Sequence, residues 1–227
     1  MKIFTSNGGE LNPATITASI PNNYSKLYVI LDNGHGVNTA GKRSPDGKLR
    51  EYAWAREITK RMKTRLDSLG IESYILVPEL TDISLEERVR RANQIHKEQK
   101  KKGKKVILLS IHCNAAGNGE WMNARGWSAW TTRGFTESDK VANCLYEAAH
   151  EILDPKKIQI REDKSDGDPD WESNFTIIYK SSMPAVLTEN FFQDNKEDVK
   201  YLLSEQGKQD CVNIHIKGIL KYLKTIK

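Results

Sequence analysis

The stretch VILLSIHCNA (residues 106–115) is almost entirely aliphatic up to His112. Two further stretches have the same character, LYVILDNGHG (27–36) and PAVLTENFF (184–192). Short apolar runs of this kind are typical of strands that are buried on both faces of a parallel sheet. Helical patterns alternate with the strand patterns along the chain. This alternation predicts an α/β fold: a single domain with a mostly parallel, twisted sheet and helices on both faces.

The segments between these runs carry recognisable helix and strand signals. Apolar residues recur on one face from Tyr52 to Leu69, and Gly70 ends that helix. Ser84 followed by Glu87 is a capping-box signature for a second helix. The buried stripe of this capped helix is predicted to be Leu85, Val89, Ala92 and Ile95. The other predicted elements are a strand over 71–77, a helix over 136–153, a strand over 175–179 and a C-terminal helix from about Gln206. A long loop is predicted over the tryptophans after residue 115.

The overall composition is that of a globular protein. The 227 residues are 38% hydrophobic and 29% charged, with a net charge of +5. Residues 1–26 show no sustained period, and we interpret them as an N-terminal extension before a domain over 27–227. The chain begins without a basic segment followed by a long apolar core, and no apolar run approaches the roughly 18 residues of a membrane span. We therefore expect a protein made in the cytoplasm without a visible signal peptide and without a membrane span.

The cysteines and the charged runs argue against a disulfide framework, a nucleic-acid site and an EF-hand calcium loop. Cys113, Cys144 and Cys211 are odd in number and widely spaced, which favours buried free thiols over a disulfide framework. The basic run QKKKGKKV (99–106) contains no aromatic residue, so we interpret it as a solvated helix end and not as a nucleic-acid site. The acidic loop 162–172 does not follow the order of an EF-hand calcium loop, and we expect it to face solvent.

Polar residues that can serve a metal ion follow each of the three apolar runs. The aliphatic part of the first run breaks off near His35, that of the second near His112, and that of the third at Glu189. Because the carboxyl ends of parallel strands meet at one edge of a sheet, we expect these side chains to lie close together. Each also has a simpler explanation without a metal. His35 would be a histidine in a turn, His112 a hydrogen-bonded histidine at a strand end, and Glu189 an exposed acid at a strand end. If Glu189 is partly desolvated instead, its pKa is raised and it is suited to carry protons.

Glu51 is the fourth candidate residue. It lies at the first turn of the predicted 52–69 helix, where the helix dipole alone favours a carboxylate by a few tenths to about 1 kcal/mol. Two histidines and a glutamate are a known set of ligands for catalytic zinc, with one position left for water. A second glutamate nearby would then act as base and acid. We interpret the other histidines, His96, His150 and His215, as structural.

Five short motifs occur in order along the chain: LDNGHG (31–36), LREYAW (49–54), SLEERVRRAN (84–93), LLSIHCNA (108–115) and SSMPAVLTENFFQDN (181–195). In these motifs the chain resembles the zinc-dependent N-acetylmuramoyl-L-alanine amidases, a family of cell-wall hydrolases that includes many phage and prophage lysins. The resemblance covers nearly the whole chain from Leu27. It does not cover the first 26 residues, and the stretch between Arg161 and Phe175 is enlarged.

The resemblance implies a role for each candidate residue. His35, Glu51 and His112 would bind Zn²⁺, and Glu189 would be the catalytic acid/base. Residues 27–227 would be the amidase catalytic domain, which hydrolyses the amide bond between N-acetylmuramic acid and L-alanine in peptidoglycan. Peptidoglycan of the cell wall is then the expected partner, and we expect a monomer. Three tryptophans either stack on sugar rings or pack their loop onto the domain: Trp121, Trp127 and Trp130.

Two other functions fit the same residues. A zinc peptidase that cuts within the peptidoglycan stem peptide would use the same set of metal ligands. A wall-binding module without catalysis would need neither a metal site nor Glu189. The complete set of ligands together with a second glutamate favours an enzyme.

Overall fold

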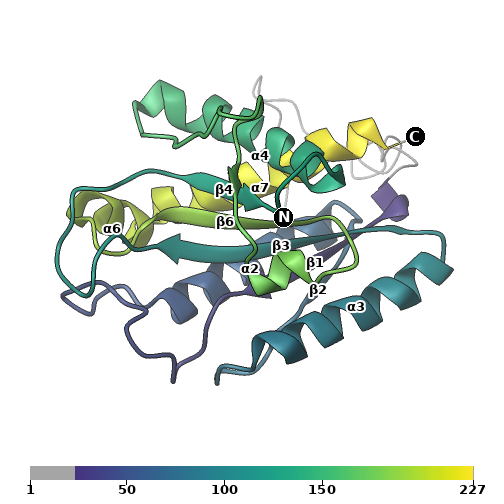
Figure 1. Ribbon diagram of the computed structural model, residues 1–227, viewed down its shortest axis with the longest axis horizontal. Coiled ribbons are helices and arrows are strands. Elements are labelled where there is room, and N and C mark those ends of the chain that lie inside the picture. The colour runs from purple at the N-terminus through teal and green to yellow at the C-terminus, as the bar shows by residue number, and fades with distance from the viewer. Residues whose placement is uncertain (1–23, 227) are drawn as a thin grey trace, which may run out of the picture.

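Six strands form one sheet in the order β2-β1-β3-β6-β4-β5 in the computed structural model, which describes residues 24–226 (Figure 1). The strands are β1 (Leu27–Asn33), β2 (Glu72–Ile75), β3 (Lys105–Asn114), β4 (Ser128–Thr131), β5 (Trp171–Glu172) and β6 (Ala185–Phe192). The four strands β2, β1, β3 and β6 are parallel, and β4 pairs with β6 in the antiparallel sense. The predicted α/β fold with a mostly parallel sheet is therefore confirmed.

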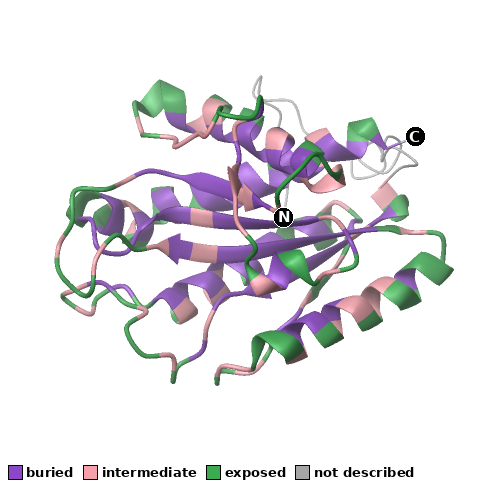
Figure 2. Cartoon of the chain, in the orientation of Figure 1, coloured by how far each residue is buried: buried purple, intermediate pink, exposed green. Residues whose placement is uncertain are grey.

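Helices cover both faces of this sheet. They are α2 (Glu51–Ser68), α3 (Leu85–Lys101), α4 (Glu137–Leu153), α5 (Thr176–Tyr179), α6 (Lys196–Leu203) and α7 (Glu205–Thr225), with short 3₁₀ turns η2 (Tyr24–Lys26) and η3 (Asp154–Lys156). One apolar cluster joins α2, α4 and α7 to the sheet, and a second joins α3 and α5 to the opposite face. Figure 2 shows the central strands buried along most of their length.

The alternation of side chains along the strands explains the two layers of core. In β3, Ile107, Leu109 and Ile111 pack in the first cluster, whereas Val106 and Leu108 pack in the second. Successive side chains of a strand point to opposite faces of the sheet, so a strand covered on both faces must be apolar throughout. The continuous apolar runs in the sequence follow from this requirement.

The N-terminal cap predicted for the second helix, α3, is confirmed. Ser84 caps α3, and its hydroxyl accepts a hydrogen bond from the backbone N–H of Glu87. Thr136 caps α4 and forms a full capping box with Asp139. Leu85 is 48% exposed, so its predicted place in the buried stripe of α3 is wrong. It lies in the first turn of the helix, before the stripe reaches the sheet, and Val89 and Ala92 supply the buried contacts.

The predicted strand over 175–179 is also wrong, because Thr176–Tyr179 form the helix α5. Ile177 and Ile178 are buried against α3, and the N–H of Tyr179 donates to the carbonyl of Phe175. A short apolar run does not distinguish a buried strand from one buried helical turn. The loop predicted after residue 115 likewise contains a strand, β4, and β6 continues past Glu189 to Phe192.

Other expectations concern the cysteines, the membrane and the N-terminal segment. The three cysteines are free and buried, as predicted. No helix within residues 24–226 combines the length and hydropathy that crossing a membrane would require. The predicted extension 1–26 lies mostly outside the described residues, which begin at Tyr24. The expectation of no signal peptide and the division at residue 27 therefore stay predictions.

Candidate metal centre and its neighbouring glutamate

Strand pairing brings the first two candidate residues to one edge of the sheet. β3 and β6 run side by side in register, and this pairing places His112 directly opposite Glu189. After β1 ends, the N–H of Gly34 still donates to the carbonyl of Ile111, which keeps the chain beside β3 as it reaches His35. A Cβ atom at Gly34 would lie 2.3–2.8 Å from atoms of the His112 ring, so only glycine leaves room for that imidazole.

Glu51 reaches the same place from the start of α2. The preceding loop folds back on itself through a β-bridge between Arg43 and Arg50, and the N–H of Glu51 donates to the carbonyl of Lys42. The side chain of Leu49 is buried. These contacts direct the first turn of α2 under the strand ends, where the Glu51 carboxylate is fully buried.

The two imidazoles and the Glu51 carboxylate form one group. Glu51 Oε1 lies 3.1 Å from His112 Nδ1 and 3.4 Å from His35 Nε2. The two rings meet edge to face, with centroids 4.9 Å apart. The N–H of Cys113 donates to Glu51 Oε1 at 3.0 Å and so fixes the carboxylate. The three residues proposed as ligands can thus each offer one donor atom within 4.8 Å of the others.

Charge keeps the Glu51 carboxylate ionised. Burial alone would raise its pKa, but the hydrogen bonds and charges of His112 and His35 outweigh burial and hold the pKa of Glu51 well below its usual range. Burial would lower the pKa of His112, and the adjacent Glu51 raises it instead. Glu51 is therefore an anion between two imidazoles, and a metal ion bound there would take the place of the ring protons that face it.

The donor set fits a transition-metal ion. Two imidazole nitrogens and one carboxylate oxygen are ligands that Zn²⁺ prefers in catalytic sites. Glu51 Oε2 is buried and has no hydrogen-bond partner among residues 24–226. A buried carboxylate oxygen rarely stays unpaired in a folded protein, and a bound cation would satisfy it.

Glu189 lies beside this group without joining it. Its side chain is partly buried, and Oε2 has no hydrogen-bond partner in the described part of the chain. Burial raises the pKa of Glu189 to about 7; the Glu51 charge adds to this effect, and the nearby positive charge of His112 opposes it. A carboxyl group with a pKa near neutrality can both accept and donate a proton.

The structure separates the roles of the three tryptophans. Trp127 is fully buried, and its Nε1 donates to the side-chain oxygen of Asn190. Asn190 in turn donates to the carbonyl of His112, so Trp127 supports the site from inside the core and is not available to stack on a sugar. Trp121 and Trp130 are partly exposed, and Trp130 packs against Trp171.

The remaining histidines lie outside the group and have partners of their own. His96 contacts the Ser182 hydroxyl, and the ring of His150 contacts Asp154 and Glu162. His215 is fully buried between Thr188 and the carbonyl of Cys211. These contacts agree with the structural roles expected for them.

The expectation that the loop 162–172 faces solvent is wrong for two of its acids. Asp168 and Asp170 are buried, and together with Asp139 they form a group of carboxylates whose oxygens lie within 4.8 Å of one another. Burial, and then the charge of Asp168, raise the pKa of Asp170 to about 8, against the hydrogen bond that Thr131 donates to it. No sequence pattern indicated this cluster, because the loop meets α4 only in the folded chain.

Fold and site together define a class of hydrolases with an α/β fold, in which a His-Glu-His group and a second glutamate lie at the carboxyl edge of a parallel sheet. The chain belongs to the N-acetylmuramoyl-L-alanine amidase family, whose family model, Amidase_3, matches residues 29–221.

Relatives and solved structures agree with this assignment. The chain is 27% identical over 205 residues to an endolysin of Bacillus phage SPP1, a match that covers 89% of this chain and 68% of the endolysin. An N-acetylmuramoyl-L-alanine amidase from Clostridium difficile 630 superposes with a TM-score of 0.74 at 25% identity, covering 90% of this chain and 100% of that one. The amidase AmiC2 of Nostoc punctiforme has the same fold, with a TM-score of 0.72 at 24% identity over 88% of this chain and 98% of that one.

Proposed function

We propose that the chain is a zinc-dependent amidase that hydrolyses the bond between N-acetylmuramic acid and L-alanine in peptidoglycan, and that it acts on the cell wall as a monomer. One observation carries the proposal. His35, Glu51 and His112 meet from three separate elements, with Glu189 directly opposite His112 across the strand pair. The family match supports the choice of substrate.

In this account His35, Glu51 and His112 would hold the metal ion. The chemistry that Zn²⁺ supplies in such a site is Lewis acidity toward the carbonyl of the scissile amide and toward water. The Cys113 N–H, bonded to Glu51 Oε1, and Gly34, packed under the His112 ring, keep the ligands in place.

Glu189 is proposed as the proton carrier. Its unpaired Oε2 would take a proton from the attacking water and then hand it to the departing amine of L-alanine. A pKa of about 7 suits both transfers, because neither the protonated nor the ionised form is strongly favoured near neutral pH.

A groove beside the site offers room for substrate. It has a volume of about 460 Å³ and is lined by the loop 40–45, the segment after β3 from Ala115 to Gly119, and Gln193. The loop 40–45 precedes Glu51 in the sequence, and Ala115 follows His112 by three residues. We assign this groove to the glycan strand or the stem peptide on one side of the scissile bond.

Mass spectrometry of digested peptidoglycan tests the reaction. The proposal predicts release of intact stem peptides that begin at L-alanine, from glycan strands whose lactyl groups become free carboxylates. A chelator should stop the release, and added Zn²⁺ should restore it. Fragments cut within the stem peptide would instead establish a peptidase, and binding without any product would establish a wall-binding module.

A further inference from the structure

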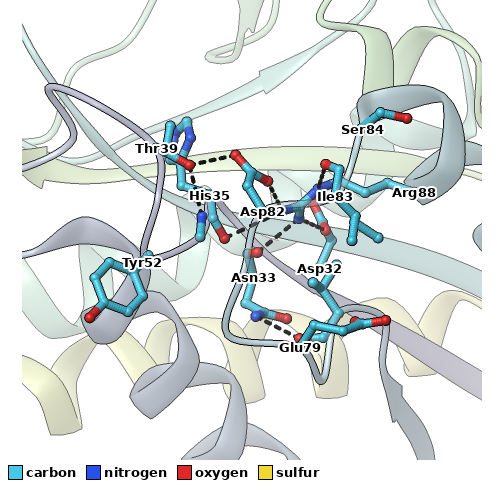
Figure 3. Close-up of polar contacts among 12 residues, drawn as sticks. Asp32, Asn33, His35, Thr39, Tyr52, Glu79, Asp82, Ile83, Ser84 and Arg88 are labelled. Carbon is cyan, nitrogen blue, oxygen red and sulfur yellow. Dashed lines mark hydrogen bonds and ion pairs between the residues drawn. The ribbon is translucent and has the colours of Figure 1, made fainter.

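A buried ion pair lies directly behind the candidate metal centre. Arg88 on α3 and Asp32 on β1 are 2% and 1% exposed, and Arg88 Nη1 donates to Asp32 Oδ1 at 2.6 Å (Figure 3). Every N–H of the guanidinium has an acceptor: the carbonyls of Ile83, Asn33 and His35, and the carboxylates of Asp32 and Asp82. A buried pair of this kind brings little net stability over an apolar packing, so its place beside the site needs another explanation.

Arg88, the cation of the pair, fixes the backbone of His35. This residue has φ 61°, in the left-handed region that is strained for any residue other than glycine. Its carbonyl accepts hydrogen bonds from Arg88 Nη2 at 3.4 Å and from Arg56 Nη1 at 2.9 Å. Two guanidinium groups thus hold the strained peptide in the conformation that directs the His35 ring toward Glu51.

The same side of Arg88 reaches the loop that follows His35. Arg88 Nη2 also donates to Asp82 Oδ1 at 2.8 Å, and Asp82 accepts a hydrogen bond from the Thr39 hydroxyl. The Thr39 hydroxyl accepts in turn from the N–H of Gly36. His35 is therefore tied at its own carbonyl and at the next residue, and Figure 3 shows these contacts converging on Arg88.

Asp32, the anion of the pair, contacts His112 through Ser110. The Ser110 hydroxyl donates to Asp32 Oδ2 at 2.6 Å. Its oxygen, Ser110 Oγ, also lies 3.1 Å from His112 Nε2. A serine hydroxyl carries a single proton, which Asp32 already accepts, so His112 Nε2 must be the donor to Ser110. Nδ1 is then the nitrogen that faces Glu51 Oε1, 3.1 Å away, and its lone pair becomes free for a cation when the proton shared with Glu51 leaves.

We propose that the Asp32–Arg88 ion pair is a positioning device for both metal-binding histidines. Asp32 selects the His112 tautomer with Nδ1 free, through Ser110, while Arg88 fixes the backbone of His35. The inference rests on the proposed metal site, and it deepens that proposal by naming the residues that orient the ligands. Partners that hold the far nitrogen of a metal-binding histidine commonly change metal affinity 10–100-fold when removed.

Arginine is required for this role because it serves several acceptors at once. Its planar group has five donors in a fixed arrangement, whereas lysine offers a point charge on a flexible stem. Here the donors reach Asp32 on one side and the His35 carbonyl on the other. No single lysine nitrogen could hold both.

Ser110→Ala is the sharpest variant, because it removes the acceptor of His112 Nε2 without leaving an unpaired charge. We expect the dissociation constant for Zn²⁺, measured with the purified full chain by competition with a chromophoric chelator, to rise about 10–100-fold. The visible absorption spectrum of the Co²⁺-substituted protein should also change, because it reports ligand geometry. The melting temperature of the metal-free protein should stay close to that of the wild type.

Asp32→Asn/Arg88→Gln tests the pair itself with both charges removed together. The matched control is Arg91→Gln, on the same helix, whose guanidinium pairs with Glu79 and Glu87 away from the site. We expect the double variant to weaken Zn²⁺ binding at least as much as Ser110→Ala, and the control to leave the Zn²⁺ affinity and the Co²⁺ spectrum unchanged.

These variants distinguish a failure of the positioning role from a failure of the metal site. Wild-type Zn²⁺ affinity and a wild-type Co²⁺ spectrum in both Ser110→Ala and the double variant would overturn the positioning role, provided that His112→Ala loses Zn²⁺ binding. Equal Zn²⁺ affinity in the wild type and His112→Ala would overturn the proposed metal site itself.

Discussion

At the scale of single residues, the environment of each carboxylate decides its chemistry. Glu51 and Glu189 lie within one site, yet their pKa values are displaced in opposite directions. Glu51 accepts hydrogen bonds from a backbone N–H and lies against two imidazoles, so it stays ionised and can bind a cation. Glu189 is desolvated with one oxygen unpaired, so it can hold a proton near neutral pH.

Glu189→Gln should abolish most of the activity without loss of metal. The amide keeps the shape of the side chain but cannot accept the proton of water, so we expect kcat to fall about 10²–10⁴-fold. Turnover of purified peptidoglycan and zinc content per chain are the two measurements. The exposed Glu197→Gln on α6 is the control and should keep full activity. Wild-type turnover by Glu189→Gln would remove this residue from the mechanism.

His215 should make the fold sensitive to mild acid. Its Nδ1 donates to the carbonyl of Cys211 and its Nε2 accepts from Thr188, so the buried ring is neutral. Burial lowers its pKa from 6.5 to about 4. The unfolded chain therefore takes up a proton first as pH falls below 6.5, and the folded state loses about 2 kcal/mol of stability between pH 7 and pH 5 from this residue.

Denaturant unfolding at the two pH values checks this prediction. His215→Asn should lose about 2 kcal/mol less than the wild type between pH 7 and pH 5. His150→Asn is the control: neighbouring carboxylates outweigh the effect of burial and raise the pKa of His150, so its removal should not protect the fold from acid. An identical loss in the wild type and His215→Asn would contradict the account.

At the scale of elements, the sequence predicts the strands and helices that have a regular local pattern. It does not predict those that depend on tertiary contacts. The apolar runs of β1, β3 and β6 and the capping signal of α3 are local, so the sequence carries them directly. The helix α5 and the strand β4 depend on what they pack against. The first was predicted as a strand and the second as a loop.

Gly34, between β1 and His35, should be essential for the shape of the site. An added Cβ would lie within 2.8 Å of three atoms of the His112 ring, so Gly34→Ala must displace the imidazole. We expect the dissociation constant for Zn²⁺ to rise about tenfold or more, by analogy with the loss of other groups that orient a ligand.

The control is Gly103→Ala, at the end of α3. There the same methyl group would meet no atom within 4 Å among the described residues, although a left-handed φ of 76° adds some strain. Titration with Zn²⁺ should give wild-type affinity for Gly103→Ala. Equal affinities in both alanine variants would show that the His112 ring does not depend on the glycine.

At the scale of the whole molecule, topology explains both the success and the limits of the sequence analysis. Parallel strands β1, β3 and β6 bring His35, His112 and Glu189 to one edge, and the order of the apolar runs was sufficient to predict this. Glu51 comes from a helix start, and only the family resemblance pointed to it. Asp32, Ser110 and Arg88 gave no separate signal, because their shared contacts join three elements.

The central claim is that His35, Glu51 and His112 bind one metal ion. An anomalous difference map from a crystal of the Zn²⁺-loaded protein, recorded at the zinc absorption edge, tests it directly. The account predicts one strong peak in contact with all three side chains, with Glu189 beside it and outside its ligands. No peak at this position, or a peak only among Asp139, Asp168 and Asp170, would contradict it.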